Sequence, residues 1–410
     1  MMRGIGARAD RMLTSFTDRE SMERSIRWVM GLILALLLLG LVMVYSARAV
    51  KADRLDGFHA RPLFYHALKV GLGLLGMLAV IRFDYRALCR HYAKLWLGVV
   101  LLLVSVLLFG AQINGSRRWF LLFGNMFQPS EFAKPVMVIV TAALLVRAGD
   151  AVDTLRRGFL PPLAAASVIA GLILMEPDFG TAMITAFLAV LIMSIGGVKI
   201  RNFVLLGLVA APLVCGFAYT RFAHVEARVE RFIQRPVGGQ VDLSLMAIGS
   251  GGVLGTGLGE SRCKLGFIPE CDSDFIFAVI GEELGLLGTT AVLLLYGLLL
   301  YHGLRVLMGI RNRFGFNVAA GMLLLVAVQA VVNVAVVLGV APTKGLPLPF
   351  VSSGGSSLLA LCLGMGLFLN IASKPDLPSV PVQDSWHTWL VSRFSADPSL
   401  RLQAGGNHDP

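Results

Sequence analysis

The residues with the clearest chemical potential lie in segment 255–285, where a glycine-rich, charged stretch runs into a long apolar stretch. Asp274 stands at the junction. A carboxylate at the mouth of a membrane helix is costly to desolvate, so it is kept mainly where it has a function. Asp274 is therefore the best candidate for a general base, and the unpaired amides of the following helix should keep it ionised. A simple helix cap is the alternative role.

Other acids near this junction have more structural interpretations. Glu270 and Asp272 lie in the preceding loop, where they could be solvated or bind a cation. Glu131 and Lys134 are three positions apart, so they share a helix face and should form an ion pair. Asp178 opens an apolar stretch and is expected to cap its helix.

Two further features belong to the same region. Glu282 and Glu283 lie about two turns inside the apolar stretch, so at least one must face the protein interior and find a partner there. We expect a network role for both. Cys263 and Cys271 could form a disulfide in an oxidising compartment, and two free thiols are the alternative.

Basic residues in this part of the chain are candidates for binding a substrate diphosphate, because guanidinium and ammonium groups form charge-assisted hydrogen bonds with phosphate oxygens. The alternative is contact with lipid headgroups. No His/Cys cluster has metal-ligand spacing, but Asp274 and a diphosphate together could hold a magnesium or manganese ion. The candidate basic residues are Arg117, Arg228, Arg231, Lys264 and Lys344.

The composition excludes an ordinary soluble globule, since 56% of the 410 residues are hydrophobic and only 15% are charged. Apolar runs of about 20 residues, long enough to cross a bilayer, recur along the chain. The sequence predicts an all-α polytopic membrane protein with about ten transmembrane helices and a large extracytoplasmic loop between helices 7 and 8. The runs are 26–47, 62–82, 95–113, 132–147, 159–175, 179–196, 202–219, 274–302, 316–340 and 355–373.

The net charge of +11 is a topology signal rather than a sign of nucleic-acid binding. Lys and Arg concentrate in alternate connecting segments, which places both termini in the cytoplasm under the positive-inside rule. We expect a cytoplasmic segment 1–25, a transmembrane domain 26–373 that includes the long loop 220–273, and a disordered cytoplasmic tail 374–410.

With this topology, the segments rich in Gly, Pro and charge all face the outer leaflet. Nucleotide triphosphates are absent there, and the glycines of 255–259 lack the preceding strand that a nucleotide-binding loop requires. These glycines are better explained as sites of close packing and sharp bends. A synthetic reaction at this face needs an already activated substrate, such as a lipid-linked diphosphate.

At these residues the chain resembles the SEDS family of polymerases (shape, elongation, division and sporulation), and its cell-division branch more than its elongation branch. Ser353 departs from the pattern, since the family usually has Tyr there. The matching motifs are NGSRRW (114–119), QPSEFAK (128–134), EPDFGT (176–181), AIGSGG (247–252), PE (269–270), DFIFA (274–278), EELG (282–285), Gln329, Asn333, PTKGLPLPFVS (342–352) and GGSS (354–357).

The resemblance implies a peptidoglycan glycosyltransferase of the inner membrane that polymerises lipid II at the division septum. Asp274 aligns with the family's essential aspartate, undecaprenyl diphosphate would leave with a divalent cation, and no nucleotide is used. The implied partners are a class B penicillin-binding protein, which crosslinks the new strand, and other divisome proteins. A lipid II flippase and a non-catalytic divisome scaffold are the alternatives.

Overall fold

The computed structural model describes residues 19–55, 61–113, 115–122, 125–208, 239–265, 268, 270–343 and 345–374. The expected terminal segments, most of the seventh expected span and the first part of the long loop lie outside these residues. So do three candidate diphosphate ligands, Arg228, Arg231 and Lys344.

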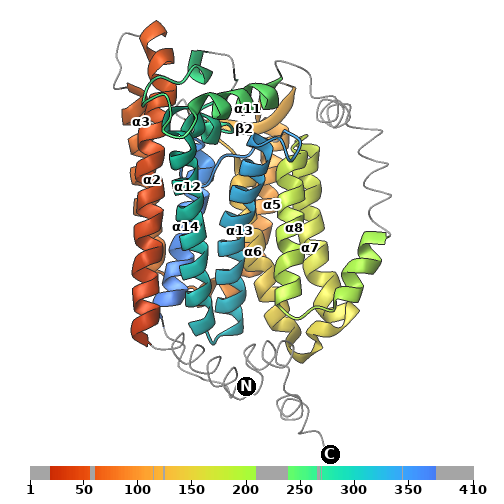
Figure 1. Cartoon of the computed structure of the whole chain (residues 1–410). Coiled ribbons are helices and arrows are strands. Elements are labelled where there is room, and N and C mark those ends of the chain that lie inside the picture. The colour runs from red at the N-terminus through yellow and green to blue at the C-terminus, as the bar shows by residue number, and fades with distance from the viewer. Residues whose placement is uncertain are drawn as a thin grey trace, which may run out of the picture.

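The described chain is a bundle of long helices (Figure 1), which confirms the polytopic membrane fold. Among the described residues, eight helices are long and apolar enough to cross a membrane, and the shorter apolar helix α8 matches one more of the expected spans, 179–196. Residues 200–208 are helical and belong to the seventh expected span. The main helices are α2 (Arg19–Leu55), α3 (Arg61–Arg82), α5 (Tyr92–Phe109), α6 (Pro129–Ala148), α7 (Leu160–Met175), α8 (Phe179–Ile195), α12 (Ile276–Gly309), α13 (Arg313–Val337) and α14 (Gly355–Ser373).

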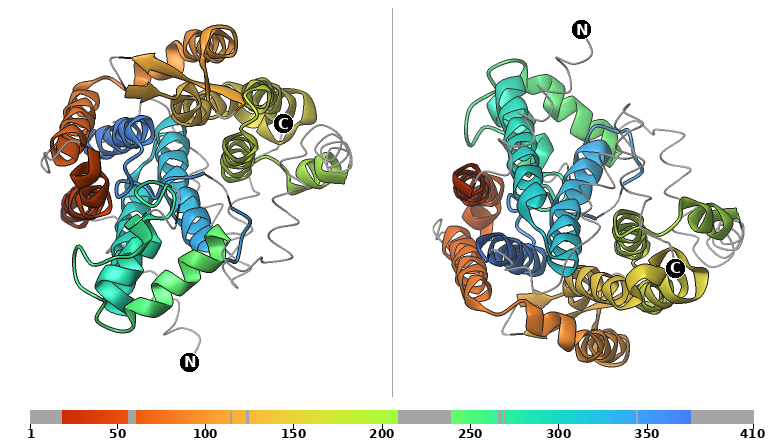
Figure 2. Two further views of the ribbon diagram at one scale, coloured as in Figure 1. Left: turned by 90° about the horizontal axis from the view of Figure 1, so that it is seen from above. Right: turned by 90° about the horizontal axis from the view of Figure 1, so that it is seen from below.

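Helices α13 and α14 lie in the middle of the bundle, as the end-on views show (Figure 2). Helix α2 packs against α12, and α3 packs against α14. Small residues allow the close approach of α3 and α14, because a Cβ at Gly366 would come within 2.7 Å of the Met77 carbonyl oxygen. The shorter helices include α4 (Arg86–Arg90) and α11 (Gln240–Gly251).

A small antiparallel sheet was not predicted from the sequence. Strands β1 (Ala111–Ile113), β2 (Ser116–Leu122) and β3 (Asn125–Phe127) follow α5, with Gln112 paired to Arg117 and Phe120 paired to Phe127. The expected third span ran to residue 113, but Gly110 is extended and ends the helix at Phe109. The sheet lies at the same end of the bundle as α11 (Figure 1).

The loop between α13 and α14 re-enters the bundle instead of lying on its surface. Phe350 and Val351 are buried against the middle of α2, where a Cβ at Gly40 would come within 2.7 Å of both of their carbonyl oxygens. The hydroxyl of Tyr296, in α12, donates to the carbonyl of Pro349. Irregular backbone can lie at this depth only because protein groups surround it.

Glu131 and Lys134 pair as predicted on the first turns of α6. The distance from Lys134 Nζ to Glu131 Oε2 is 2.8 Å, and both side chains are almost fully buried. Buried charges of this kind are tolerated only as a pair.

The turn between α7 and α8 contains a second buried acid. Asp178 caps α8 as predicted, with its Oδ1 accepting from the Thr181 amide at 3.1 Å. Arg118 donates from Nε to the Glu176 carbonyl at 3.0 Å, which joins β2 to this turn. The Glu176 carboxyl is buried, and neither of its oxygens accepts a hydrogen bond from a residue that the structure describes. Burial raises its pKa to about 8, Asp178 adds to the rise, and Arg118 opposes it.

Replacing Lys134 by Met should strongly destabilise the protein, because it leaves the Glu131 carboxylate buried without a counter-charge. We expect a loss of about 3–5 kcal/mol, seen as a lower melting temperature in detergent. The double variant Glu131→Gln/Lys134→Met should recover most of this loss. Lys199→Met is the matched control, since the Lys199–Asp153 pair is largely exposed and its removal should change the melting temperature little.

Replacing Glu176 by Gln should remove a pH-dependent loss of stability. The pKa of Glu176 is higher in the folded protein than the usual 4.5, so the folded state binds the proton more tightly. The penalty therefore grows as pH rises from about 4.5 to 8, to roughly 5 kcal/mol. Melting curves from pH 5 to 9 should show wild type falling relative to Glu176→Gln up to about pH 8. Parallel curves, like those expected for the exposed control Glu260→Gln, would contradict this assignment.

Candidate functional site

Asp274 lies immediately before the first turn of α12, at the end of the bundle that carries α11 and the sheet. The cap position of α12 is Phe275, and no side chain caps the helix. The Asp274 carboxylate instead accepts a hydrogen bond on Oδ1 from the Ser273 hydroxyl at 3.1 Å. The alternative role as a helix cap is therefore excluded, and one oxygen, Oδ2, has no hydrogen bond to a described residue.

The backbone around Asp274 is held from α13 and from the re-entrant loop. Buried Asn333 donates through Nδ2 to the Asp274 carbonyl at 2.8 Å and to the Leu346 carbonyl at 2.7 Å. Ser352 donates to the Ser273 carbonyl at 2.6 Å. One side chain of α13 thus fixes the re-entrant loop and the start of α12 in a common position.

The re-entrant loop forms one wall of the site. A Cβ at Gly345 would lie 3.0 Å from Asp274 Oδ2, so the absence of a side chain there keeps this oxygen uncovered. Asp274 itself is half-buried. The carboxylate is thus sheltered by protein on one side and reachable on another.

The electrostatics of Asp274 differ from our sequence-based expectation. Helix amides were expected to keep it ionised, but burial raises the pKa of the Asp274 carboxyl to about 7. The Ser273 hydroxyl opposes the rise, and the negative charges of Glu270, Asp272 and Glu131 add to it. Burial outweighs the helix amides because the carboxylate precedes the cap position and accepts none of their hydrogen bonds. A base with a pKa near neutral pH suits proton abstraction.

Asp272 is not a solvated loop residue. It is almost fully buried, and its Oδ2 lies 2.6 Å from both Nε and Nη2 of Arg48, at the end of the apolar part of α2. The Ser353 hydroxyl also donates to this oxygen at 2.9 Å. Asp272 therefore anchors α2 and the re-entrant loop two residues before Asp274.

Glu282 and Glu283 are both buried in a network, as predicted. Glu283 accepts from the Ser46 hydroxyl at 2.7 Å and pairs with Lys264 Nζ at 3.3 Å. Glu282 accepts from the Arg262 amide at 2.9 Å. The pairing contradicts the expected diphosphate role of Lys264, because its ammonium group is buried against Glu283 and not presented to a ligand.

The glycines before this network make bends and close contacts, as expected. Gly255 has a φ of +84°, and a Cβ there would lie 2.1 Å from the Glu283 carbonyl oxygen. The Thr256 amide donates to the Glu282 carbonyl at 2.9 Å. Gly285 has a φ of +66° and kinks α12 at this contact.

The possible disulfide is not formed. Cys263 and Cys271 are both buried free thiols. The Cys263 thiol hydrogen-bonds with Glu282, and its amide donates to the same carboxylate at 3.3 Å. Burial, helped by Glu282, raises the pKa of Cys263 to about 12, which keeps it in the unreactive thiol form.

For Arg117, the expected role in binding a diphosphate stays a prediction. Arg117 is exposed on β2 and donates to the Leu108 carbonyl at 3.2 Å, away from the contacts of Asp274. Sequence reasoning missed the positioning role of Asn333 and the pairing of Arg48 with Asp272. It also did not single out Lys69 of α3. For Lys69 a signal was present, since it is a lone charge within an apolar run.

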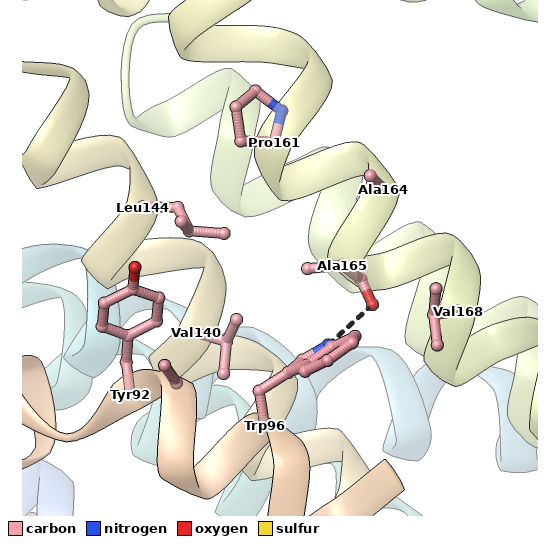
Figure 3. A pocket seen from close by; sticks show the side chains of 9 residues that line it. Tyr92, Trp96, Val140, Leu144, Pro161, Ala164, Ala165 and Val168 are labelled. Carbon is pink, nitrogen blue, oxygen red and sulfur yellow. Dashed lines mark hydrogen bonds between the residues drawn. The ribbon is translucent and has the colours of Figure 1, made fainter.

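A separate cavity of about 310 Å³ lies between α5, α6 and α7 (Figure 3). Its lining is apolar apart from Tyr92 and Trp96, and the Trp96 indole donates to the Ala165 carbonyl at 3.2 Å. It contains no group suited to catalysis, so the candidate active site is the region around Asp274.

The chain is similar to curated proteins over most of its length. Among curated proteins, the chain is 37% identical to "Probable peptidoglycan glycosyltransferase FtsW" of Coxiella burnetii, over 85% of this chain and 96% of that protein. It is 36% identical to "Stage V sporulation protein E" of Bacillus subtilis, over 83% and 94% of the two chains.

Solved structures share the fold. A chain from the structure described as "Structural coordination of polymerization and crosslinking by a peptidoglycan synthase complex" matches with a TM-score of 0.71 and 28% identity, over 85% of this chain and 97% of that one. The rod shape determining protein RodA of Thermus thermophilus matches with a TM-score of 0.63, 28% identity and the same coverage.

The family profile described as "Cell cycle protein", which covers FtsW, RodA and SpoVE, matches residues 27–376. The match spans all the described transmembrane helices except the first turns of α2, together with the re-entrant loop and Asp274. The chain therefore belongs to the FtsW/RodA/SpoVE family of cell cycle proteins, the SEDS family that its motifs resemble.

Proposed function

We propose that this protein is a peptidoglycan glycosyltransferase that polymerises lipid II into β-1,4 glycan strands for septal wall synthesis in cell division. The observation that carries the proposal is Asp274, a half-buried carboxylate with a pKa near 7 and an uncovered oxygen beside the re-entrant loop. Names of the relatives support the same activity, since FtsW of Bacillus subtilis, described as a probable peptidoglycan glycosyltransferase, is 37% identical.

In the proposed reaction, the Asp274 carboxylate takes the proton from the 4-hydroxyl of the acceptor GlcNAc. The hydroxyl oxygen attacks the anomeric carbon of the donor MurNAc as the bond from that carbon to the diphosphate breaks. Undecaprenyl diphosphate leaves with the bonding electrons, and the configuration inverts from α to β. The half-exposed position of Asp274 lets it return the proton to solvent after each step.

A divalent cation, magnesium or manganese, is part of the proposal. The described residues contain no group of three or more His, Cys, Asp or Glu side chains that could hold a metal ion. Magnesium usually binds through one or two carboxylates and substrate phosphates, and exposed Glu270 is a nearby carboxylate that would hold it with the diphosphate while Asp274 acts as the base. When bound, the cation would offset negative charge on the leaving diphosphate.

The charge distribution and the relatives support a proposed placement in the cell. We propose that both termini face the cytoplasm and that the Asp274 end faces the outer side of the inner membrane at the septum. A class B penicillin-binding protein is the proposed crosslinking partner, consistent with the peptidoglycan synthase complex that contains a structural relative. Other divisome proteins complete the proposed assembly.

Replacing Asp274 by Asn should abolish polymerisation, because the amide has the same shape but cannot accept a proton. We expect at least about a hundredfold loss of rate, the usual scale of general-base catalysis. The assay combines purified protein, a class B penicillin-binding protein, lipid II and magnesium or manganese, and measures glycan polymer on a gel.

Lys199→Gln, at an exposed basic residue paired with Asp153, is the matched control and should polymerise normally. Full activity of Asp274→Asn would overturn the base assignment. If wild type moves lipid II across vesicle membranes and forms no polymer, the flippase is favoured. If wild type shows neither transfer nor polymerisation, the non-catalytic scaffold is favoured.

The polymerisation rate should also depend on pH in a direction set by Asp274. A base must be deprotonated to act, and burial raises the pKa of this carboxyl to about 7. We therefore expect kcat/KM to fall about tenfold per pH unit below pH 7 and to level off above it. A rate that stays constant from pH 5 to 8 would show that Asp274 titrates elsewhere or that another step limits the reaction.

A further inference from the structure

Lys69 is a cation without a partner inside an apolar helix. It lies in the segment Leu63–Arg82 of α3, which is apolar enough to cross a membrane. The side chain is half-buried, and no hydrogen bond or ion pair joins its ammonium group to any residue that the structure describes. A charge at such a position is costly unless an opposite charge or a ligand compensates it.

The Lys69 side chain lies against the first residue of α14. A Cβ at Gly355 would come within 3.1 Å of Lys69 Cδ, 3.3 Å of Cε and 3.5 Å of Nζ. The absence of a side chain at Gly355 therefore lets the ammonium group rest beside the start of a 19-residue helix. No side chain caps this helix, so its first amides and Lys69 form a positive region together.

Two buried side chains beside this region also lack hydrogen-bond partners among the described residues. The Ser357 hydroxyl, in the first turn of α14, is 4% exposed and makes no hydrogen bond to any of them. His66 lies one turn before Lys69, is 2% exposed, and neither of its ring nitrogens has a partner in the described part of the chain. Buried polar groups are rarely left unsatisfied, so these groups indicate a ligand that approaches α3 and α14 at this point.

Among the described residues, positive charges outnumber negative charges around Lys69. The charged and titratable groups that act on it and on His66 are Arg48 and Asp272. Asp272 is already engaged by Arg48 at 2.6 Å and by Ser353 at 2.9 Å. Two cations thus face one carboxylate, and an added anion would restore neutrality. Asp272 is two residues before Asp274, which connects this positive region to the candidate active site.

We infer that Lys69 and the first turn of α14 bind a phosphate group of a lipid-linked diphosphate. Helix amides and an ammonium group together form a typical phosphate site. The inference deepens the proposed function and rests on it, because it assigns these residues to the diphosphate of the polyprenyl-linked substrate. A phospholipid headgroup carries a similar phosphate, so the test must separate the two sources.

The test measures binding of undecaprenyl diphosphate to the purified full chain in detergent by native mass spectrometry, with phosphatidylglycerol as the competing lipid. Lys69→Gln should weaken the binding at least about tenfold, and Lys69→Arg should retain most of it. Gly355→Ala should also weaken it, because the new methyl group pushes Lys69 from its place. Lys199→Gln and Gly31→Ala are matched controls, since Lys199 is exposed and a Cβ at Gly31 meets no atom within 4 Å.

Thermal melting provides a second readout. If Lys69 only stabilised the fold, its replacement would lower the melting temperature of the lipid-free protein. If Lys69 is a ligand-binding group, its charge is uncompensated when no lipid is bound. Lys69→Gln should then melt at or above the wild-type temperature without lipid. Added undecaprenyl diphosphate should stabilise wild type and leave Lys69→Gln unchanged. A lower melting temperature of lipid-free Lys69→Gln, together with undiminished binding, would overturn the inference in favour of a structural role.

The outcomes separate this site from the proposed activity. Equal binding by Lys69→Gln and wild type overturns the phosphate site, even where wild type polymerises lipid II. Lys69-dependent binding of undecaprenyl diphosphate supports the site, even where wild type forms no polymer and the proposed function fails. Equal displacement by phosphatidylglycerol would assign the site to phospholipid headgroups and overturn its connection to the substrate.

Discussion

The re-entrant loop between α13 and α14 is the segment on which the site depends, because its backbone must find hydrogen bonds at membrane depth. Asn333 meets part of this requirement by binding the carbonyls of Leu346 and Asp274 together. Tyr296 and Gly40 accommodate the deepest part of the loop, one by a hydrogen bond and the other by leaving space. The same contacts that satisfy the loop therefore position the carboxylate proposed to act as the base.

Three ion pairs hold buried charge near the candidate site, whereas Asp274, Lys69 and the more distant Glu176 form no ion pair with any described residue. Glu131 pairs with Lys134, Glu283 with Lys264, and Asp272 with Arg48. Asp274 has no cationic partner among the described residues, and its pKa rises accordingly. Lys69 has no anionic partner of its own among the described residues. The ion pairs stabilise the fold, whereas the Asp274 carboxylate and the Lys69 ammonium group remain available to a substrate. Such a substrate would bring a hydroxyl proton to the carboxylate and a diphosphate to the ammonium group.

The helices were predictable because each is an apolar run of membrane-crossing length, and a run of this kind has few other solutions in a bilayer. Short-range pairs were equally predictable, since Glu131 and Lys134 share a helix face whatever the rest of the fold does. The β1–β3 sheet escaped prediction because its outer strands have only three residues each. Lys264 was misjudged, and the state of Cys263 was left open, because their partners, Glu283 and Glu282, became neighbours only when the loop folded back onto α12.

The sequence by itself determined the membrane fold, the family and Asp274 as the leading candidate base, because hydropathy and motif spacing are local properties of the chain. Only the tertiary structure decided how Asp274 behaves as an acid. Its pKa depends on burial and on the charges of Glu270, Asp272 and Glu131, one of which is remote in sequence. Desolvation and Coulomb interactions act through space, so the chain order could place the carboxylate at the mouth of α12 but could not give its affinity for a proton.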